Sequence, residues 1–372
     1  MAELVAIDQD PYDVVVVGGG QAGLAISYHL NRSGVRHLVL EAAGQVGASW
    51  AHRWDSLRLF TPATYSALPG LPFPGPGDRY PTGTDVARYL ADYAEHFDLP
   101  VRTSSAVQTL AQDRTAGNTP ADVFTLATPT RLITAARVIV ATGAFGAPAT
   151  PGFAPDLGPD LPVLHSHDYR RPSDVPDGAV LVVGAGNTGY QLALELARNG
   201  RTVHLAQGNA GRTVPQRVAG RDIFWWLTRS GMITAPADSA VGRRLRANDP
   251  VIGTSRTTLR TAGVRFRPRA VGGTGRTVAF ADNTSLRPDG VLWATGYRHD
   301  DRWINVPETL DEHGTLRTTG LDTAVRGLHV LGRPWQRSRG SALLGFVGQD
   351  AHHLAAAVVT GQDTARSRRR AP

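Results

Sequence analysis

Gly18, Gly20 and Gly23 are the residues of this chain whose spacing points most directly to chemistry. In such a Gly-x-Gly-x-x-Gly pattern, the first glycine allows a tight turn and the second lets the backbone approach a diphosphate. The third lets a helix pack closely on a strand. The four valines at 14–17 predict a buried strand, and residues 22–30 predict a helix whose N-terminus favours anions. These residues predict the phosphate-binding turn of a dinucleotide site.

A second strand is predicted at residues 37–40, and it ends at Glu41, eighteen residues after Gly23. A carboxylate at this place accepts hydrogen bonds from ribose hydroxyls. Strand, turn, helix, strand and acidic residue are therefore all in register, which favours a dinucleotide site over an ordinary glycine-rich loop.

The same pattern returns at Gly184, Gly186 and Gly189, after a valine-rich strand at 179–183 and before a helix that ends near Gly200. One such match arises readily by chance, whereas two matches in full βαβ context do not. Two bound dinucleotides in one chain indicate electron transfer between a nicotinamide and a second dinucleotide, for which we expect FAD.

The second site lacks an acidic residue at the position equivalent to Glu41, where Gln207 stands. A carboxylate there would repel a 2′-phosphate and an arginine would attract it, but glutamine does neither strongly. Arg212 and Arg217 follow and can reach a phosphate. We therefore expect NADPH to be used, with NADH accepted as well.

The composition excludes several kinds of chemistry. The chain of 372 residues has no cysteine, and all 39 of its basic residues are arginine. Disulfides, thiolate metal sites, cysteine nucleophiles and lysine Schiff bases are thus ruled out, and no metal site is expected. The net charge of +7 is modest. We expect residues 365–372, which hold four arginines, to be a disordered tail, and we expect no nucleic-acid partner, no membrane segment and a cytoplasmic location.

The rest of the chain predicts an α/β fold with two Rossmann-like domains, one inserted in the other. A strand at 137–140 runs into Ala141-Thr142-Gly143, and a strand at 289–293 runs into Ala294-Thr295-Gly296. Such turns lie at the carboxyl edge of a parallel sheet, where ligands bind. We expect one domain at 1–165 and 291–372, a second at 166–290, and a final helix at 351–361 whose N-terminus faces a flavin.

These motifs, together with His165-Ser166-His167-Asp168-Tyr169, resemble the class B flavin-containing monooxygenases, a family that includes Baeyer–Villiger enzymes. The family linker F-x-G-x-x-x-H-x-x-x-Y/F is matched by His165 and Tyr169 but not by Pro159 and Leu161. The resemblance implies a glutathione-reductase-like arrangement in which FAD, reduced by NADPH, reacts with O2 to give a C4a-(hydro)peroxyflavin. That species would oxygenate a small sulfide, amine or ketone.

The resemblance and the motifs together define the expected site residues. Beside the flavin, Phe60 stands where many relatives have an asparagine, Thr61 is a substitute donor, and Arg58 and Arg339 are candidates for an oxygen-activating arginine. Asn187 is expected to serve both catalysis and cofactor binding. The remaining cofactor-binding residues are expected to be Gly18, Gly20, Gln21, Ala22, Gly23, Glu41, Gln45, Ser49, Trp50, Trp54, Leu57, Val107, Thr142, Gly143, Gly184, Gly186, Thr188, Gly189, Gln207, Arg212, Arg217, Ala294, Thr295, Gly296, Gln349 and Asp350.

Two other functions fit the same residues. A reductase would pass electrons from NAD(P)H through FAD to a quinone or a protein without inserting oxygen, and a sensor would bind nucleotides without turnover. The aromatic segment 220–227 fits a substrate wall and domain packing equally well. A homodimer is compatible with the sequence, and the substrate is not defined by it.

Overall fold

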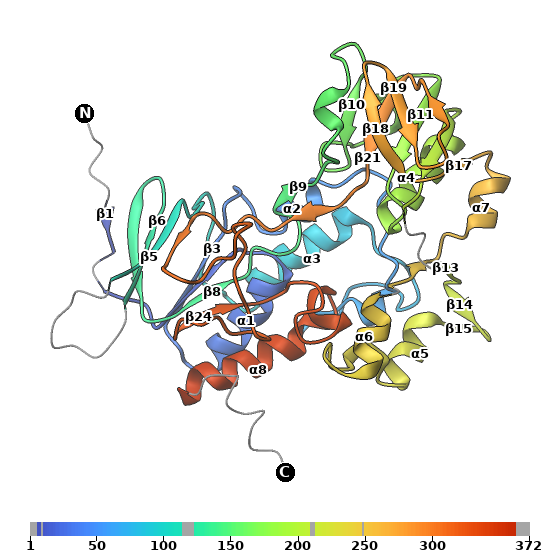
Figure 1. Ribbon diagram of the computed structural model, residues 1–372. Coiled ribbons are helices and arrows are strands. Elements are labelled where there is room, and N and C mark those ends of the chain that lie inside the picture. Colours follow the sequence, from blue (N-terminus) through green and yellow to red (C-terminus); the bar gives the residue numbers. More distant parts are fainter. Residues whose placement is uncertain (1–5, 9, 114–122, 209–212, 248, 362–372) are drawn as a thin grey trace.

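Two parallel sheets of five strands form the frame of the molecule (Figure 1). The computed structural model describes residues 6–8, 10–113, 123–208, 213–247 and 249–361. The strand order of the first sheet is β24 (Leu328–Val330), β8 (Val138–Val140), β2 (Val14–Val17), β3 (His37–Leu40) and β4 (Val101–Arg102). That of the second is β10 (Val163–His165), β21 (Gly290–Trp293), β11 (Ala179–Val183), β12 (Thr202–Ala206) and β17 (Arg265–Arg267). This confirms the predicted α/β class with two Rossmann-like units.

The valines of β2 pack against two different layers. Val14 and Val16 lie in a core with three helices, α1 (Gln21–Arg32), α3 (Gly83–His96) and α8 (Val347–Thr360). Val15 and Val17 face a mixed sheet on the other side. Its strands are β1 (Ala6–Ile7), β7 (Arg131–Ala135), β6 (Val123–Ala127), β5 (Thr109–Asp113) and β23 (Ile304–Asn305). Both faces of β2 are covered, and this is why all four of its residues are valines.

The second sheet carries α4 (Asn187–Arg198) and α7 (Arg256–Thr261) against its core, with Val180, Val182 and Leu205 in contact with them. An antiparallel meander covers its other face, through Val278 and Phe280. The meander consists of β18 (Ala270–Thr274), β19 (Thr277–Phe280) and β20 (Ser285–Leu286).

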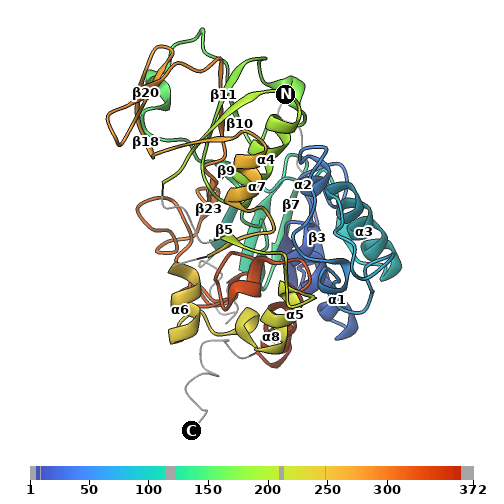
Figure 2. The ribbon, with the colours of Figure 1, turned by 90° about the vertical axis from the view of Figure 1, so that its right-hand side faces the viewer.

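Between β12 and α7 the chain leaves the second sheet and returns to the first unit, where it lies beside the start of α8 (Figure 2). This excursion consists of β13 (Thr213–Val214), β14 (Arg217–Val218), β15 (Arg221–Asp222), α5 (Ile223–Arg229), the 3-10 turn η4 (Met232–Thr234), α6 (Ala240–Ala247) and β16 (Val251–Ile252). A further 3-10 turn, η5 (Arg339–Ala342), packs against η4, α6 and α8. The excursion thus covers the loop that precedes α8.

The chain crosses between the two units at a narrow ribbon. Here β9 (Ala147–Pro148) pairs antiparallel with β22 (Tyr297–Arg298), and the Ala149 N–H donates to the Gly296 carbonyl at 2.9 Å (Figure 1). The sequence analysis assigned Val163–His165 and residues 291–293 to the first domain, but both strands hydrogen bond within the second sheet. The physical reason is that a Rossmann sheet recruits the strand ending in Ala294-Thr295-Gly296 beside its own first strand. We propose that the units divide at this ribbon.

Short helical turns connect these elements: α2 (Ala48–Ala51), η1 (Ala63–Tyr65), η2 (Ala154–Asp156) and η3 (Pro172–Asp174). Within the described ranges, no helix combines the length and the apolarity that crossing a bilayer would demand. The predicted tail at 365–372 lies outside the described residues.

Helix α3 begins with a reciprocal cap, and its removal gives a testable stability change. The Asp85 N–H donates to the Thr82 hydroxyl at 3.1 Å, and the Thr82 N–H donates to the Asp85 carboxylate at 2.9 Å. Thr82→Ala leaves one N–H of the first turn unpaired, which we expect to cost about 1 kcal/mol, or about 2 °C in melting temperature. Thr84→Ala, at an exposed position of the same turn, is the control and should melt like the unsubstituted chain.

Candidate functional site

The first fingerprint turn has the backbone geometry that a diphosphate requires. Gly18 has φ +110°, and a Cβ there would lie 2.5 Å from the Ala141 carbonyl oxygen. A Cβ on Gly23 would lie 1.8 Å from the Gly18 oxygen, so helix and strand are in close contact. A Cβ on Gly20 would meet no protein atom within 4 Å. The turn is therefore closed toward the protein and open at Gly20, where a phosphate would approach.

The second fingerprint repeats this geometry. Gly184 has φ +119° with its Cβ position 2.2 Å from the Ala294 oxygen, and the Cβ position of Gly189 lies 1.9 Å from the Gly184 oxygen. Gly186 is open, with no protein atom within 4 Å of its Cβ position. Both turns thus fit a dinucleotide, and in both the helix begins directly after the open glycine, at Gln21 and at Asn187. Ala22 and Thr188 lie in the first turns of these two helices.

Glu41 closes the first turn from the next strand. Its Oε2 accepts from the Gly19 N–H at 2.7 Å, and its Oε1 accepts from the Ala43 N–H at 2.9 Å. A carboxylate has about four acceptor positions, so two remain for ribose hydroxyls. The same negative charge disfavours a 2′-phosphate, which matches the chemistry of FAD better than that of NADPH.

Gln207 faces an arginine that the sequence analysis did not identify. It is buried, its Nε2 donates to the Tyr190 hydroxyl at 3.1 Å, and its Oε1 accepts from Arg256 at 2.6 Å. The Arg256 guanidinium also lies 4.4 Å from the centre of the Phe266 ring. The cation beside the second ribose position therefore comes from α7, 49 residues further along the chain.

The sequence predicted Arg212 and Arg217 for this position. Arg212 lies outside the described residues. Arg217 is exposed in β14 and interacts with Tyr80 of the first unit. Arg217 thus contacts the first unit, and we propose Arg256, which contacts Gln207, as the residue that would meet a 2′-phosphate.

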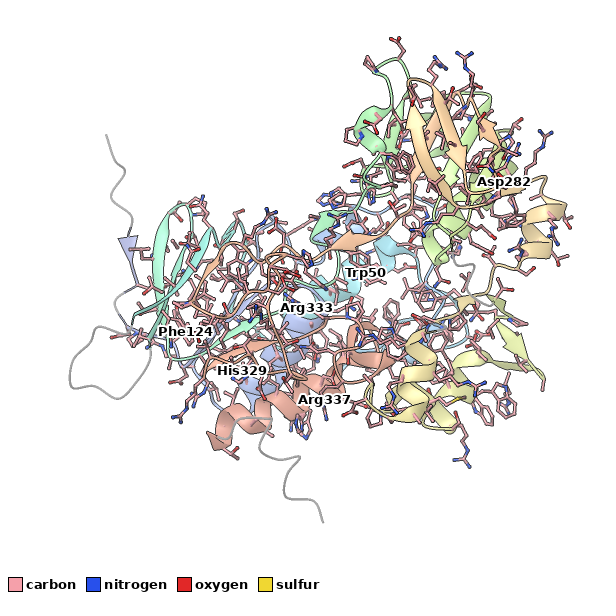
Figure 3. All side chains as sticks on the ribbon, in the orientation of Figure 1. Trp50, Phe124, Asp282, His329, Arg333 and Arg337 are labelled. Carbon is pink, nitrogen blue, oxygen red and sulfur yellow. The ribbon has the colours of Figure 1, made fainter. Side chains whose placement is uncertain are left out.

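Trp50 and Gln21 join the first fingerprint to its surroundings. The Trp50 indole N–H donates to the Gln21 Oε1 at 3.0 Å, and the Gln21 Nε2 donates to the Ala342 carbonyl at 2.8 Å. Trp50 is half-buried and lies between the two units (Figure 3). Gln21, the first residue of α1, therefore connects the phosphate-binding turn directly to the loop before α8.

Trp54 and Leu57 pack between the two units. Both are buried, and they contact the core of the second unit through Tyr169 and Tyr190. These contacts join the two units, and a place for both residues along the cofactor stays a prediction. Gln45 and Ser49 are exposed on the loop around α2.

Phe60 lies in an aromatic cluster built by four separate segments. Its ring stacks on Phe224 at 5.9 Å between centres, and Tyr65 stacks on Phe346 at 6.4 Å. The buried members of this cluster are Phe224, Ile233, Ile252 and Phe346. The segment 220–227 therefore packs against the residue that we expected to stand beside the flavin.

Asn187 links this cluster to the second fingerprint. Its Oδ1 accepts from the Ile252 N–H at 2.9 Å. On the other side, Gln216 donates to the Phe60 carbonyl and to Asp222, both at 2.9 Å. The aromatic cluster is thus hydrogen bonded to the start of the second fingerprint helix and to the backbone of the Phe60 segment.

Two of the predicted catalytic residues are engaged elsewhere. The Thr61 hydroxyl is buried and forms a 2.9 Å hydrogen bond with the Ser66 hydroxyl. Arg58 is exposed, with a long 3.4 Å contact to the Tyr80 carbonyl. Neither side chain belongs to the aromatic cluster, and a catalytic role for either one stays a prediction.

The turns after β8 and β21 lie next to the fingerprints. Gly143 and Gly296 both have positive φ, and their neighbours Ala141 and Ala294 contact the first glycine of each fingerprint. Thr142 precedes Gly143, and the Thr295 hydroxyl donates to the Ala149 carbonyl. His165 contacts the Gly296 carbonyl at 3.1 Å, and burial lowers the pKa of His165 below 6.5.

Val107, also predicted to bind the cofactor, packs at the edge of the core of the mixed sheet.

The start of α8 holds a buried acid. Asp350 accepts from Arg337 at 3.1 Å, and burial raises its pKa although Ser341 and Arg337 act in the opposite direction. Its neighbour Gln349 is exposed. In the part of the chain that the structure describes, no group of three or more His, Asp or Glu is placed to hold a metal ion.

Arg256, Asp249 and the Tyr80–Asp222 pair were missed by the sequence analysis. Tyr80 donates to Asp222 at 2.7 Å across 142 residues, and Asp249 accepts from Arg339 at 2.8 Å across 90. No local motif marks such contacts, and in a chain whose basic residues are all arginine a single arginine does not stand out.

Known proteins share this architecture. The family described as pyridine nucleotide-disulphide oxidoreductase matches residues 15–220. An uncharacterized CzcO-like oxidoreductase of Geobacillus kaustophilus is 38% identical, over 92% of this chain and 97% of its own. A probable indole-3-pyruvate monooxygenase of Arabidopsis thaliana, YUCCA3, is 27% identical, over 82% of this chain and 77% of its own. The flavin-containing monooxygenase of Stenotrophomonas maltophilia superposes with a TM-score of 0.78 at 27% identity, over 95% of this chain and 99% of its own.

Proposed function

Because this chain belongs to the pyridine nucleotide-disulphide oxidoreductase family and, within it, to the flavin monooxygenases, we propose that it oxygenates a small organic molecule. In this reaction NADPH, a proton, O2 and the substrate give NADP⁺, water and the oxygenated substrate. A sulfide, amine or ketone is the expected substrate class. The family name refers to disulfides, but this chain has no cysteine to form an internal redox pair.

The observation that carries the proposal is the pair of open, matched fingerprints with different partners. The first has the Glu41 carboxylate and would hold FAD, and the second has Gln207 with Arg256 and would hold NADPH. Bound FAD supplies the reaction with O2. The chain's own residues would hold the two diphosphates at Gly20 and Gly186, and the apolar rings of the aromatic cluster would help to exclude water from the reaction.

The test is anaerobic reduction of the purified holoenzyme with NADPH or NADH, followed by mixing with oxygenated buffer. A transient absorbance band that precedes the spectrum of oxidised flavin, together with one oxygenated product per NADPH consumed, supports the proposal. Direct reoxidation without such a band, combined with rapid electron transfer to a quinone, would favour the reductase instead. A sensor would bind NADPH without any loss of flavin colour.

A further inference from the structure

Arg339 is a buried cation whose hydrogen-bonding capacity is only partly used. It lies in η5, in the loop between β24 and α8, and its residue is 8% exposed. Its Nε donates to the Asp249 carboxylate at 2.8 Å. One terminal nitrogen, Nη1, is buried and has no hydrogen-bond partner among the described residues. A buried charged donor without a partner is costly to the folded chain, so a ligand that satisfies it is the natural explanation.

The position of Arg339 is close to both the fingerprint and the aromatic cluster. The next residue, Gly340, has its Cβ position 2.9 Å from the Phe346 Cβ and 3.4 Å from the Ile233 carbonyl oxygen, and both residues belong to the cluster. The same turn ends at Ala342, whose carbonyl accepts from Gln21 of the first fingerprint. A molecule that reaches the Arg339 guanidinium would therefore have aromatic rings beside it and the flavin turn nearby.

The charges around Arg339 leave it available to an anion. Asp249 is its only carboxylate partner in the described part of the chain, and its side chain is 45% exposed, so water screens it. The two other arginines of this loop, Arg333 and Arg337, are paired with the buried carboxylates of Asp301 and Asp350. A guanidinium presents its donors as a planar fork that matches a carboxylate, and it stays charged at every relevant pH.

We infer that Arg339 binds the carboxylate of the substrate, and that the aromatic cluster of Phe60, Phe224 and Phe346 binds an apolar, aromatic body. The inference rests on the proposed function and narrows its substrate class to small aryl carboxylic acids. Their apolar part would carry the atom that is oxygenated. In this arrangement Arg339 is a binding and specificity-determining residue.

The experiment measures binding of two probes of the same shape to the oxidised holoenzyme by titration calorimetry. Phenylacetate carries the carboxylate, and phenylacetamide replaces it with a neutral amide. The unsubstituted chain should bind phenylacetate at least about tenfold more tightly than phenylacetamide. Arg339→Gln should remove that difference, and Arg339→Lys, which keeps the charge without the fork, should restore part of it. The control is Arg246→Gln, at an exposed position of α6, which should bind both probes unchanged.

The Asp249→Asn variant tests the inference a second time, with Arg339 left unchanged. Removing the competing carboxylate should tighten phenylacetate binding about threefold and leave phenylacetamide unaffected. The inference is overturned if Arg339→Gln binds phenylacetate as the unsubstituted chain does, or if neither probe binds at millimolar concentration. It is also overturned if Arg339→Gln loses flavin or NADPH instead, because the guanidinium would then belong to a cofactor. If Arg339→Gln does not fold, an Asp249→Asn chain that binds phenylacetate no more tightly overturns it as well.

This measurement is independent of turnover. A chain that binds phenylacetate through Arg339 but gives no oxygenated product would refute the proposed function and leave the carboxylate site standing. A chain that oxygenates a neutral sulfide at the same rate with and without Arg339, and shows no preference for phenylacetate, would refute the carboxylate site and leave the proposed function standing.

Discussion

Gly18→Ala should be isolated without flavin, whereas Gly184→Ala should retain its flavin and lose rapid reduction by NADPH. The two substitutions are matched, because each adds one methyl group at the first glycine of a fingerprint. Each glycine has a φ that disfavours other residues, +110° and +119°, and each added Cβ would lie within 2.5 Å of a backbone carbonyl oxygen. The turn must move, and the phosphate-binding amides move with it.

We expect the rate of Gly184→Ala reduction at a fixed NADPH concentration to fall at least about 100-fold, which corresponds to about 2.7 kcal/mol. Flavin content after purification and the anaerobic reduction rate are the two measurements. Gly20→Ala and Gly186→Ala are the controls for folding, since their Cβ positions are open, and both should melt like the unsubstituted chain. A Gly184→Ala chain that loses flavin would contradict the assignment of FAD to the first fingerprint.

Arg256→Gln should weaken NADPH binding by about 30-fold and change NADH binding by less than about twofold. The reason is that only NADPH carries the 2′-phosphate, and a charge-assisted hydrogen bond to phosphate contributes about 2 kcal/mol. The glutamine also leaves the Gln207 Oε1 without its 2.6 Å partner, so a small loss of stability is expected too.

The measurement is the dependence of the anaerobic reduction rate on the concentration of each nucleotide. Arg217→Gln is the informative comparison, because the sequence analysis assigned the phosphate to Arg217 and the structure directs that side chain to Tyr80. If Arg217→Gln weakens NADPH binding and Arg256→Gln does not, the reassignment made above is wrong.

The two fingerprints were predictable from sequence because each is a local feature. Strand, turn and helix follow within about a dozen residues, and each glycine is required by an atom of the same turn or of the adjoining strand. The predicted acidic and neutral residues after the second strands, Glu41 and Gln207, likewise follow from a fixed offset along a βαβ unit. The fold class was predictable for the same reason.

The partners of these residues were not predictable, because the fold brings them together across long stretches of chain. Gln207 and Arg256 are 49 residues apart, and Asp249 and Arg339 are 90 apart. The excursion 213–252 returns to the first unit without any sequence signal for that path. Trp54 is a further example, because its burial against the core of the second unit joins parts of the chain that no local pattern connects.

The ribbon of β9 and β22 has a mechanical consequence. Two short strands, held together by backbone hydrogen bonds and flanked by Gly146 and Gly296, carry the chain from one sheet to the other and back, and the excursion 213–252 is a second connection between the units. Such a paired strap bends and twists far more easily than it stretches. Because the excursion 213–252 and the buried side chains of Trp54 and Leu57 also join the two units, we expect the strap to permit small bends, which change the angle between a nucleotide held at Gly186 and the first unit, and not a free swing.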